Sequence, residues 1–238
     1  MAEPSKLDPP LTTEDGDFSA SDLLLDRLAH DLRGPLSPLQ TATYLLRRPE
    51  LEAAQRDELL SIIDRQTTRL STMVQEVSDW MRARRSRLVG RRVPVAPALV
   101  VDLAAASSGP AVDITVDTAL EEVAIDGDAQ RLVQMLATLF AFMQARDPDG
   151  AVSLRAHAHG NEVVLEIATP AARWAAGERA GLFAVAEAAP FDEGLGMRLL
   201  IAREIAIAHG GEIQAADTAQ GNALIRVRLP TAPAEVEG

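Results

Sequence analysis

The first third of the chain carries apolar residues in a helical pattern. Leucines recur three, four or seven positions apart, at Leu25, Leu28, Leu32, Leu36, Leu39 and Leu46. This spacing follows one buried face of an α-helix. The pattern predicts a helix from a cap at Ser19 or Ser21 to about Arg47, and a second helix that begins at Pro49. Because the connection is short, we expect the two helices to form an antiparallel hairpin.

The pattern changes near residue 89, where short apolar runs begin to alternate with helical segments. We expect helices at 97–106 and 128–146, and strands at 93–95, 112–116, 122–125, 151–157, 162–168, 212–216 and 223–229. Asp126 or Asp128 would cap the longer helix. Residues 170–190 are rich in alanine and are expected to be helical. Helices mixed with a mainly antiparallel sheet predict an α/β sandwich with the helices on one face.

These elements divide the chain into four parts and place it in the α+β class. We expect a polar tail at 1–18, the helical hairpin at 19–88, the α/β sandwich at 89–230 and a short tail at 231–238. A hairpin with a long apolar face on each helix cannot bury that surface alone. We therefore expect a homodimer in which two hairpins form a four-helix bundle, with packing against the rest of the same chain as the alternative.

The amino-acid composition excludes several classes of function. The chain of 238 residues has no cysteine, which excludes disulfides and thiolate metal sites. Its net charge of −12 argues against nucleic acid as a partner. No apolar run is long enough to span a bilayer, and no signal peptide opens the chain. These features lead us to expect a cytoplasmic protein without a membrane span.

A histidine on the polar side of the first helix is the main candidate for chemistry. With Leu25 at zero and about 100° per residue, His30 falls at about 140°, well away from the leucine stripe. Gly34, Ser37 and Thr41 fall on the same outward side. Asp31 could hold one ring nitrogen and leave the other as a nucleophile, although an ordinary surface histidine is the simpler alternative.

Residues 30–36 read His-Asp-Leu-Arg-Gly-Pro-Leu. The segment resembles the phosphoacceptor box of two-component sensor histidine kinases, His-Glu/Asp-Leu-Arg-x-Pro-Leu, and matches it at every fixed position. The resemblance implies that His30 accepts a phosphoryl group, with Asp31 as its orienting or basic neighbour. It also implies that a receiver domain docks on the outward face of the helix, at Arg33, Gly34, Ser37 and Thr41.

The second half resembles the ATP-binding domain of the same kinases, the Bergerat-type ATPase fold. Residues 131–136, Arg-Leu-Val-Gln-Met-Leu, are similar to the start of the family's asparagine box. Residues 194–197, Gly-Leu-Gly-Met, are similar to its last glycine box and run into a predicted helix. For Gly194 and Gly196, a tight turn that lets this helix pack is the alternative interpretation.

The departures from the family concern the groups that bind the nucleotide. Thr138 and Phe142 stand where the family has two asparagines, the second of which binds Mg²⁺, and phenylalanine offers no oxygen donor. Thr169 stands where an aspartate binds adenine, and Asp192 stands at a glycine position, where its charge would repel phosphates. We therefore predict a vestigial nucleotide site, with no ATP and no metal bound by this chain.

The resemblance thus implies a histidine phosphotransfer protein without its own ATP-dependent autophosphorylation. His30 would shuttle phosphate between the aspartates of response-regulator or hybrid-kinase receiver domains, and the receiver would supply the Mg²⁺. Gly34 replaces the Thr or Asn that the family often carries four residues after the histidine, so we expect weak dephosphorylation of a partner. Two alternatives stay open: an active sensor kinase that phosphorylates His30 from ATP, and a non-catalytic scaffold that binds receivers.

Overall fold

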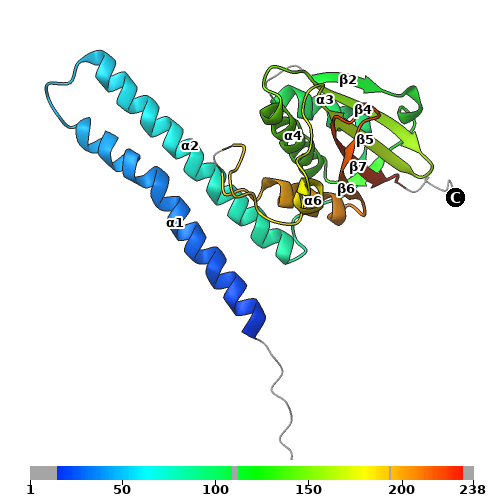
Figure 1. Cartoon of the computed structure of the whole chain (residues 1–238), viewed down its shortest axis with the longest axis horizontal. Coiled ribbons are helices and arrows are strands. Elements are labelled where there is room, and N and C mark those ends of the chain that lie inside the picture. Colours follow the sequence, from blue (N-terminus) through cyan, green and yellow to red (C-terminus); the bar gives the residue numbers. More distant parts are fainter. Residues whose placement is uncertain (1–14, 109–111, 193, 233–238) are drawn as a thin grey trace, which may run out of the picture. The chain divides into compact units, whose positions relative to one another are not determined.

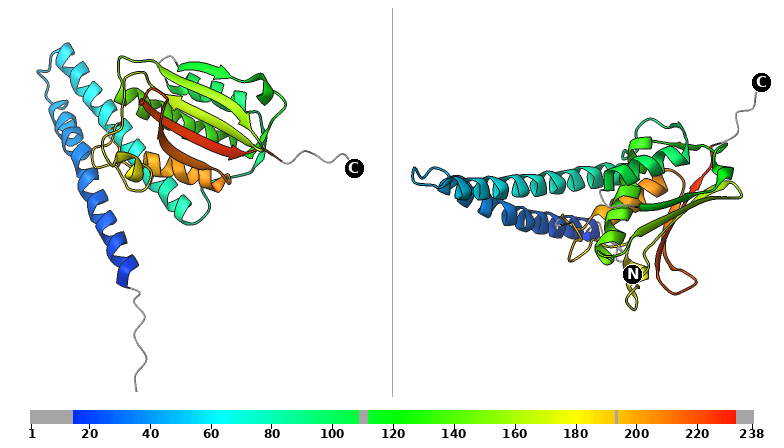
Figure 2. Two further views of the ribbon diagram at one scale, coloured as in Figure 1. Left: turned by 45° about the vertical axis from the view of Figure 1, so that its right-hand side comes forward. Right: turned by 90° about the horizontal axis from the view of Figure 1, so that it is seen from above.

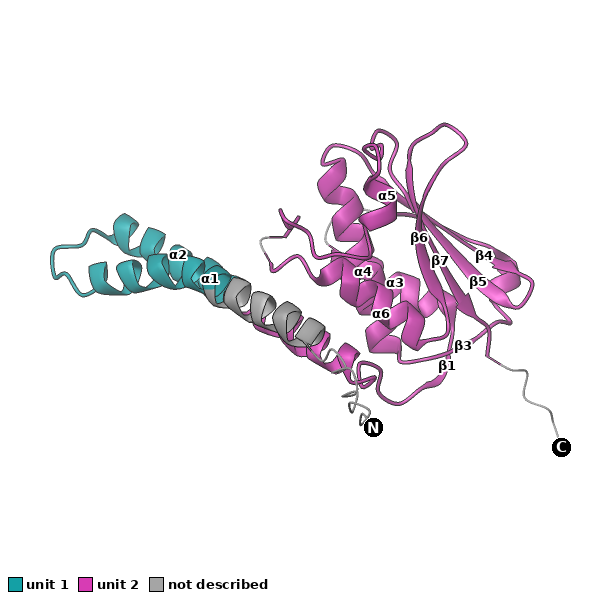
Figure 3. Cartoon of the chain, turned by 60° about the horizontal axis from the view of Figure 1, so that its bottom comes forward, with its two compact units in different colours: residues 1–70 teal, residues 71–238 magenta. Residues whose placement is uncertain are grey.

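The computed structural model describes residues 15–108, 112–192 and 194–232, with side chains from His30 onward (Figure 1). Most of the tails predicted at 1–18 and 231–238 lies outside these residues. The chain divides into two compact units, residues 1–70 and residues 71–238 (Figure 3). The division differs from the predicted border near residue 88, because the end of the second helix packs within the second unit.

Two long helices, α1 (Asp15–Leu45) and α2 (Ala53–Arg84), form the predicted hairpin. The caps predicted for α1 are wrong, since Ser19 and Ser21 already lie inside the helix. The start predicted for α2 is also wrong. Pro49 lies in the connecting turn, and the side chain of Gln55 accepts a hydrogen bond from the Glu52 N–H (3.3 Å) at the beginning of the helix.

Within the first unit, the apolar face of α1 is only partly covered. Pro35 and Ala42 are buried, and Leu32 and Leu39 are half-buried. Leu36, which was expected on the buried stripe, is 41% exposed. A helix with a single partner helix in its own chain cannot cover a stripe of this width.

The second unit is built on a five-stranded sheet of order β2-β4-β5-β7-β6, in which only β2 and β4 are parallel. A separate two-stranded ribbon pairs β1 with β3. The strands are β1 (Val93–Val95), β2 (Val112–Val116), β3 (Ile125–Gly127), β4 (Val152–His159), β5 (Glu162–Ala168), β6 (Glu212–Asp217) and β7 (Ala223–Pro230). The helices are α3 (Pro97–Ser108), η1 (Thr118–Leu120), α4 (Ala129–Arg146), α5 (Glu178–Gly181) and α6 (Arg198–Ala208).

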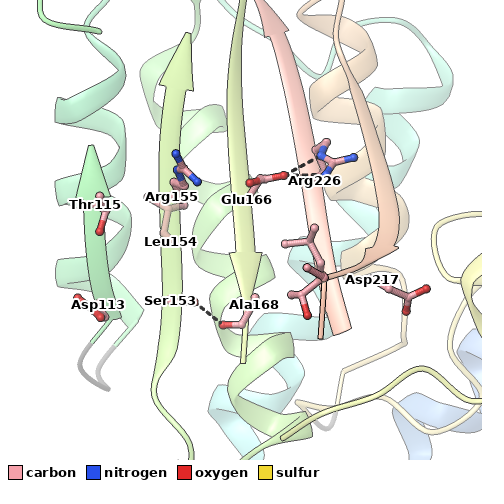
Figure 4. Close-up of a pocket in the computed structure, with 12 residues that line it drawn as sticks. Asp113, Thr115, Ser153, Leu154, Arg155, Glu166, Ala168, Asp217 and Arg226 are labelled. Atoms are coloured by element: carbon pink, nitrogen blue, oxygen red, sulfur yellow. Dashed lines mark hydrogen bonds and ion pairs between the residues drawn. The ribbon is translucent and has the colours of Figure 1, made fainter. Parts of the chain in front are cut away.

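The sheet has one apolar face and one polar face, as the sequence pattern predicts. Helices α3, α4 and α6 cover the apolar face (Figure 2). Leu154, Ile167 and Ile225 are aligned across three strands of this face and are buried. On the opposite face, Glu166 lies between Arg155 and Arg226 in the same register and pairs with Arg226 at 2.7 Å (Figure 4). The α/β sandwich is therefore confirmed.

Two local predictions in this unit differ from the structure. The strand expected at 122–125 lies at Ile125–Gly127, where it pairs with β1. Residues 170–190, expected to be helical, contain a single helix of four residues, Glu178–Gly181. The contacts that hold this segment outweigh its intrinsic helix propensity.

Candidate functional site

His30 lies on α1 with 85% of its side chain exposed. Its Nδ1 atom lies 3.2 Å from a carboxylate oxygen of Asp31, close to a hydrogen bond. A carboxylate at Nδ1 fixes the ring in the tautomer that carries its proton on that atom. The other nitrogen, Nε2, is then the atom available to attack an electrophile.

The residues predicted to receive a partner lie on the same exposed side of the helix. Gly34, Ser37 and Thr41 follow His30 at helical spacing, and these residues and Arg33 are exposed. A Cβ atom built on Gly34 would meet no atom within 4 Å. The hydroxyl of Thr41 donates to the carbonyl of Ser37 (3.0 Å) and so stays close to the helix. Another protein could therefore approach His30 along a surface of short side chains.

An aromatic cluster surrounds the position where the family would place its magnesium ligand. Phe142 on α4 is buried and stacks on Trp174, with ring centroids 6.4 Å apart. The edge of Phe191 meets Phe142 at a centroid distance of 5.5 Å. The guanidinium of Arg146 lies 4.7 Å from the centre of the Trp174 ring. Aromatic side chains thus occupy this position, and they carry no oxygen that could bind a cation.

Arg146 fastens the segment after β5 onto α4. Its guanidinium donates to both carboxylate oxygens of Glu178, at 2.5 and 3.1 Å, and to the carbonyl of Arg173 at 2.9 Å. Although burial acts to raise it, the hydrogen bond from Arg146 lowers the pKa of Glu178 below its usual value. These contacts connect the segment to α4 at Arg173 and Glu178.

The two threonines of the predicted nucleotide site are buried. Thr138 on α4 and Thr169 after β5 are 3% and 2% exposed. The hydroxyl oxygen of Thr169 has no hydrogen-bond partner. Thr138 borders a pocket of about 430 Å³ that is also lined by Glu76 and Arg198. A larger pocket of about 660 Å³ lies on the polar face of the sheet and includes none of the predicted site residues (Figure 4).

Both glycines of the loop before α6 lie in close contact with other parts of the chain, and the contact at Gly196 is with backbone. Gly196 has φ of +77°, and a Cβ there would come within 2.4 Å of the Glu187 carbonyl. A Cβ on Gly194 would lie 2.0 Å from a carboxylate oxygen of Glu76. These contacts support the packing interpretation of the two glycines. Asp192, predicted to repel phosphates, pairs with Arg198 at 2.6 Å and accepts the Gly194 N–H.

Glu76 is the residue that the sequence reasoning missed. It lies on α2 and is 3% exposed, and one carboxylate oxygen accepts the backbone N–H groups of Leu195 and Met197, both at 3.1 Å. Burial raises its pKa to about 7. A signal was present, because Glu76 follows Met73 and precedes Trp80 at helical spacing, so an acid interrupts the apolar stripe of α2.

A second acid on the same side of α2 binds α4. Asp79 is fully buried and accepts hydrogen bonds from Arg131 and Gln134, both at 2.9 Å. Although burial acts to raise it, hydrogen bonds from Gln75 and Gln134 and the charge of Arg131 lower the pKa of Asp79. Arg131 and Gln134 belong to the segment that resembles the asparagine box, and in the structure they bind the end of α2.

The helical hairpin is similar in sequence to a known family of domains. Residues 20–85 match the model of the His Kinase A (phospho-acceptor) domain. The helical hairpin is therefore similar to a phospho-acceptor domain. His30 and Asp31 lie inside the matched segment. No curated protein matches the chain.

Solved structures of histidine kinases share the fold of both halves of the chain. Acinetobacter baumannii histidine kinase AdeS matches with a TM-score of 0.62 at 15% identity, over 86% of this chain and 98% of AdeS. ThkA, solved in complex with response regulator protein TrrA, matches with a TM-score of 0.65 at 16% identity, over 92% of this chain and 63% of ThkA. Full-length ShkA, solved in complex with AMPPNP, matches with a TM-score of 0.60 at 24% identity, over 90% and 46%.

At these identities the likeness shows the fold, which is that of a histidine kinase core with its ATP-binding domain. The chain spans about half of ShkA and less than two thirds of the ThkA chain. Among the described residues, none of the helices is both long enough and apolar enough to cross a membrane. In the same part of the chain, no group of three or more His, Asp or Glu side chains is placed to hold a metal ion.

Proposed function

We propose that this chain is a histidine phosphotransfer protein of a two-component phosphorelay, which works without phosphorylating itself from ATP. The phospho-acceptor domain and the histidine kinase fold support a role in two-component signalling. The observation that favours phosphotransfer over kinase activity is the aromatic cluster of Phe142, Trp174 and Phe191, which fills the expected magnesium position.

The proposed reaction moves a phosphoryl group from a receiver aspartate to His30. Nε2 attacks the phosphorus, the N–P bond forms, and the bond between phosphorus and the aspartyl oxygen breaks, which releases the aspartate as a carboxylate. The proton on Nδ1 stays with the ring, and Asp31 offsets the charge of the imidazolium. Transfer to a second receiver reverses these steps. Mg²⁺ bound by the receiver would stabilise the phosphoryl oxygens.

The predicted docking residues fit a receiver domain as the partner. Arg33, Gly34, Ser37 and Thr41 form an exposed surface beside His30. ThkA, which shares the fold, was solved in complex with a response regulator. In the first unit, Leu36, Tyr44 and Leu60 are 41, 67 and 45% exposed, and a second hairpin of the same kind would cover them in a homodimer.

A phosphotransfer assay with isolated receivers tests the proposal. Receiver domains are phosphorylated on their aspartate with a labelled phosphodonor, freed of that donor and mixed with the full chain. We expect label to appear on the chain within seconds to minutes and to be absent from the His30→Ala variant. His159→Ala is the matched control, since His159 is also exposed but lies on β4, and it should accept label normally.

The same assay separates the alternatives. Labelled Mg-ATP alone should leave the chain unlabelled, and labelling of His30 by ATP would make it an active kinase. If no receiver of the organism labels the chain, and His30→Ala binds receivers as well as the unaltered chain does, the chain is a non-catalytic scaffold and the proposal is wrong.

A further inference from the structure

Glu76 has an unusual position for an acid. Its carboxylate is buried, yet its two hydrogen bonds come from backbone N–H groups of a loop 119 and 121 residues further along the chain. Its other oxygen, Oε1, is buried and has no hydrogen-bond partner. Leaving a carboxylate oxygen in this state costs free energy, so the two N–H groups must offset a considerable penalty.

The loop that receives this carboxylate has the geometry of an anion site. Leu195 and Met197 present their N–H groups immediately before α6, an eleven-residue helix whose N-terminus carries partial positive charge. The left-handed conformation of Gly196 lets both N–H groups turn toward the same oxygen. Gly194 leaves the space that the other oxygen of Glu76 occupies. The loop is therefore shaped around an anion, and the anion present is a side chain.

We propose that the loop of residues 194–197 is an anion cradle whose built-in occupant is Glu76, which latches residues 71–84 of α2 to the N-terminus of α6. The ligand class of the cradle is a carboxylate or a phosphate, and the internal carboxylate excludes a free anion. This inference concerns the second unit alone and does not depend on the reaction of His30.

The charges around the latch make it sensitive to pH. Glu187 is held against the loop by its backbone, whose N–H donates to the Gly196 carbonyl (2.9 Å). Burial raises the pKa of both Glu76 and Glu187 to about 7. The charge of Asp192 adds to both shifts, and the charge of Glu76 adds to the shift of Glu187. Arg198, which pairs with Asp192, and Arg146 act in the opposite direction. On α2, Asp79 is neutralised by Arg131.

As the pH rises through 7, both carboxyls become charged in a buried place, and like charges repel there. We therefore expect the loop to hold a neutral carboxyl group below neutral pH and the carboxylate above it, so that the hydrogen bonds from Leu195 and Met197 change across this range.

The amide resonances of Leu195 and Met197 test the occupant directly. In a pH titration followed by NMR, both should shift with a midpoint near 7, and the shift should disappear in Glu76→Gln. Glu187→Gln leaves the hydrogen bonds of Glu76 in place and should keep the shift. Asp79→Asn removes a different contact of α2 with the same unit and should leave the shift in place. Shifts that are unchanged in Glu76→Gln would overturn the proposal.

Inorganic pyrophosphate tests whether the loop is an anion cradle. It should perturb the two amides in Glu76→Ala at least tenfold more strongly than in the unaltered chain, and Glu76→Gln, which fills the same space, should resemble the unaltered chain. Equal effects in all three proteins would mean that Glu76 does not occupy the loop. No effect in a folded Glu76→Ala variant would mean that the loop binds no anion. Neither measurement uses a receiver, ATP or His30.

Discussion

Gly34 lies on the exposed side of α1 beside His30 and has no side chain that a partner could contact. It lies one turn after His30, is exposed, and has open space where a side chain would begin. A hydroxyl at this position could orient a water molecule toward the phosphoaspartate of a docked receiver. Its absence removes a group that could assist hydrolysis while leaving the attack by His30 intact.

Replacing Gly34 by threonine should therefore add dephosphorylation. We expect Gly34→Thr to accelerate the loss of phosphate from a receiver by about tenfold or more, as positioned polar groups do for proton transfer. Gly34→Val is the matched control, because valine has the size and β-branched shape of threonine and a similar helix propensity but no hydroxyl. The decay of phosphorylated receiver in the presence of each variant is the measurement, and equal decay with both variants would contradict the prediction.

Glu76 should give the stability of the chain a distinct dependence on pH. Its pKa is about 7 in the folded chain and returns to an ordinary 4.5 on unfolding. Between these values the folded state holds a proton that the unfolded state has lost, so stability decreases as the pH rises and becomes constant above about 7. Glu187 acts in the same sense. His209, whose pKa is lowered by burial, acts in the opposite sense.

Glu76→Gln isolates the contribution of this one carboxyl. The amide keeps an oxygen for the two N–H groups and does not titrate, so the difference in unfolding free energy between pH 5 and pH 8 should become smaller by on the order of 2–3 kcal/mol. The contributions of His209 and the remaining acids stay in both proteins. Urea denaturation at the two pH values is the measurement, and an unchanged difference would show that Glu76 titrates normally.

At the scale of the elements, the aromatic cluster is a structural unit that joins α4 to the segment after β5. The ring of Phe142 packs against the rings of Trp174 and Phe191. Arg146 on α4 forms an ion pair with Glu178 in the segment after β5. A substitution that restores the family's asparagine at Phe142 would therefore place it among packed side chains rather than in an open nucleotide site.

Phe142→Asn should not create a magnesium-nucleotide site. It places an amide among Trp174, Phe191 and the stem of Arg146, and it should lower the unfolding free energy by about 3–5 kcal/mol, as other large-to-small changes at buried aromatic residues do. Phe142→Leu, which keeps an apolar side chain, should cost less. Calorimetric titration with Mg-ATP should give no binding for the unaltered chain or for either variant. Micromolar binding to the unaltered chain would contradict the prediction.

Helices α2 and α4 and the strands β4 and β5 show which features of the fold can be predicted from the sequence. Asp128 caps α4 through the N–H groups of Gln130 and Arg131, and β4 pairs with β5 in a hairpin, as local signals indicated. Residues 170–190 were predicted as a helix because alanine favours one. In the structure this segment contacts α4, where Arg146 binds the Arg173 carbonyl and lies over the Trp174 ring. Periodicity identified α2 but could not indicate that Glu76 meets the loop before α6. Such contacts depend on the tertiary fold. The spacing of residues in a single sequence does not reveal them.

At the scale of the whole molecule, the two halves carry different parts of the proposed function. The hairpin, which is similar to a phospho-acceptor domain, carries His30, and the α/β half shares its fold with histidine kinase structures. In the proposed function, His30 reacts and the aromatic cluster around Phe142 takes the place of a magnesium site. The hairpin also leaves apolar side chains exposed in the first unit, Leu36, Tyr44 and Leu60. We propose that a second copy of the chain covers these side chains.

Charge introduced on that face should separate the copies. We expect the chain to sediment as a dimer, at twice the 25.5 kDa of one chain, and Leu60→Glu to shift it toward the monomer, because the substitution would bury a carboxylate in the expected apolar interface. Arg155→Glu, an equally drastic change of charge on the polar face of the sheet, should leave the dimer intact. Sedimentation velocity at micromolar concentration is the measurement. A monomeric unaltered chain would mean that the apolar face of the hairpin packs against another part of the same chain, and the four-helix bundle would then be wrong.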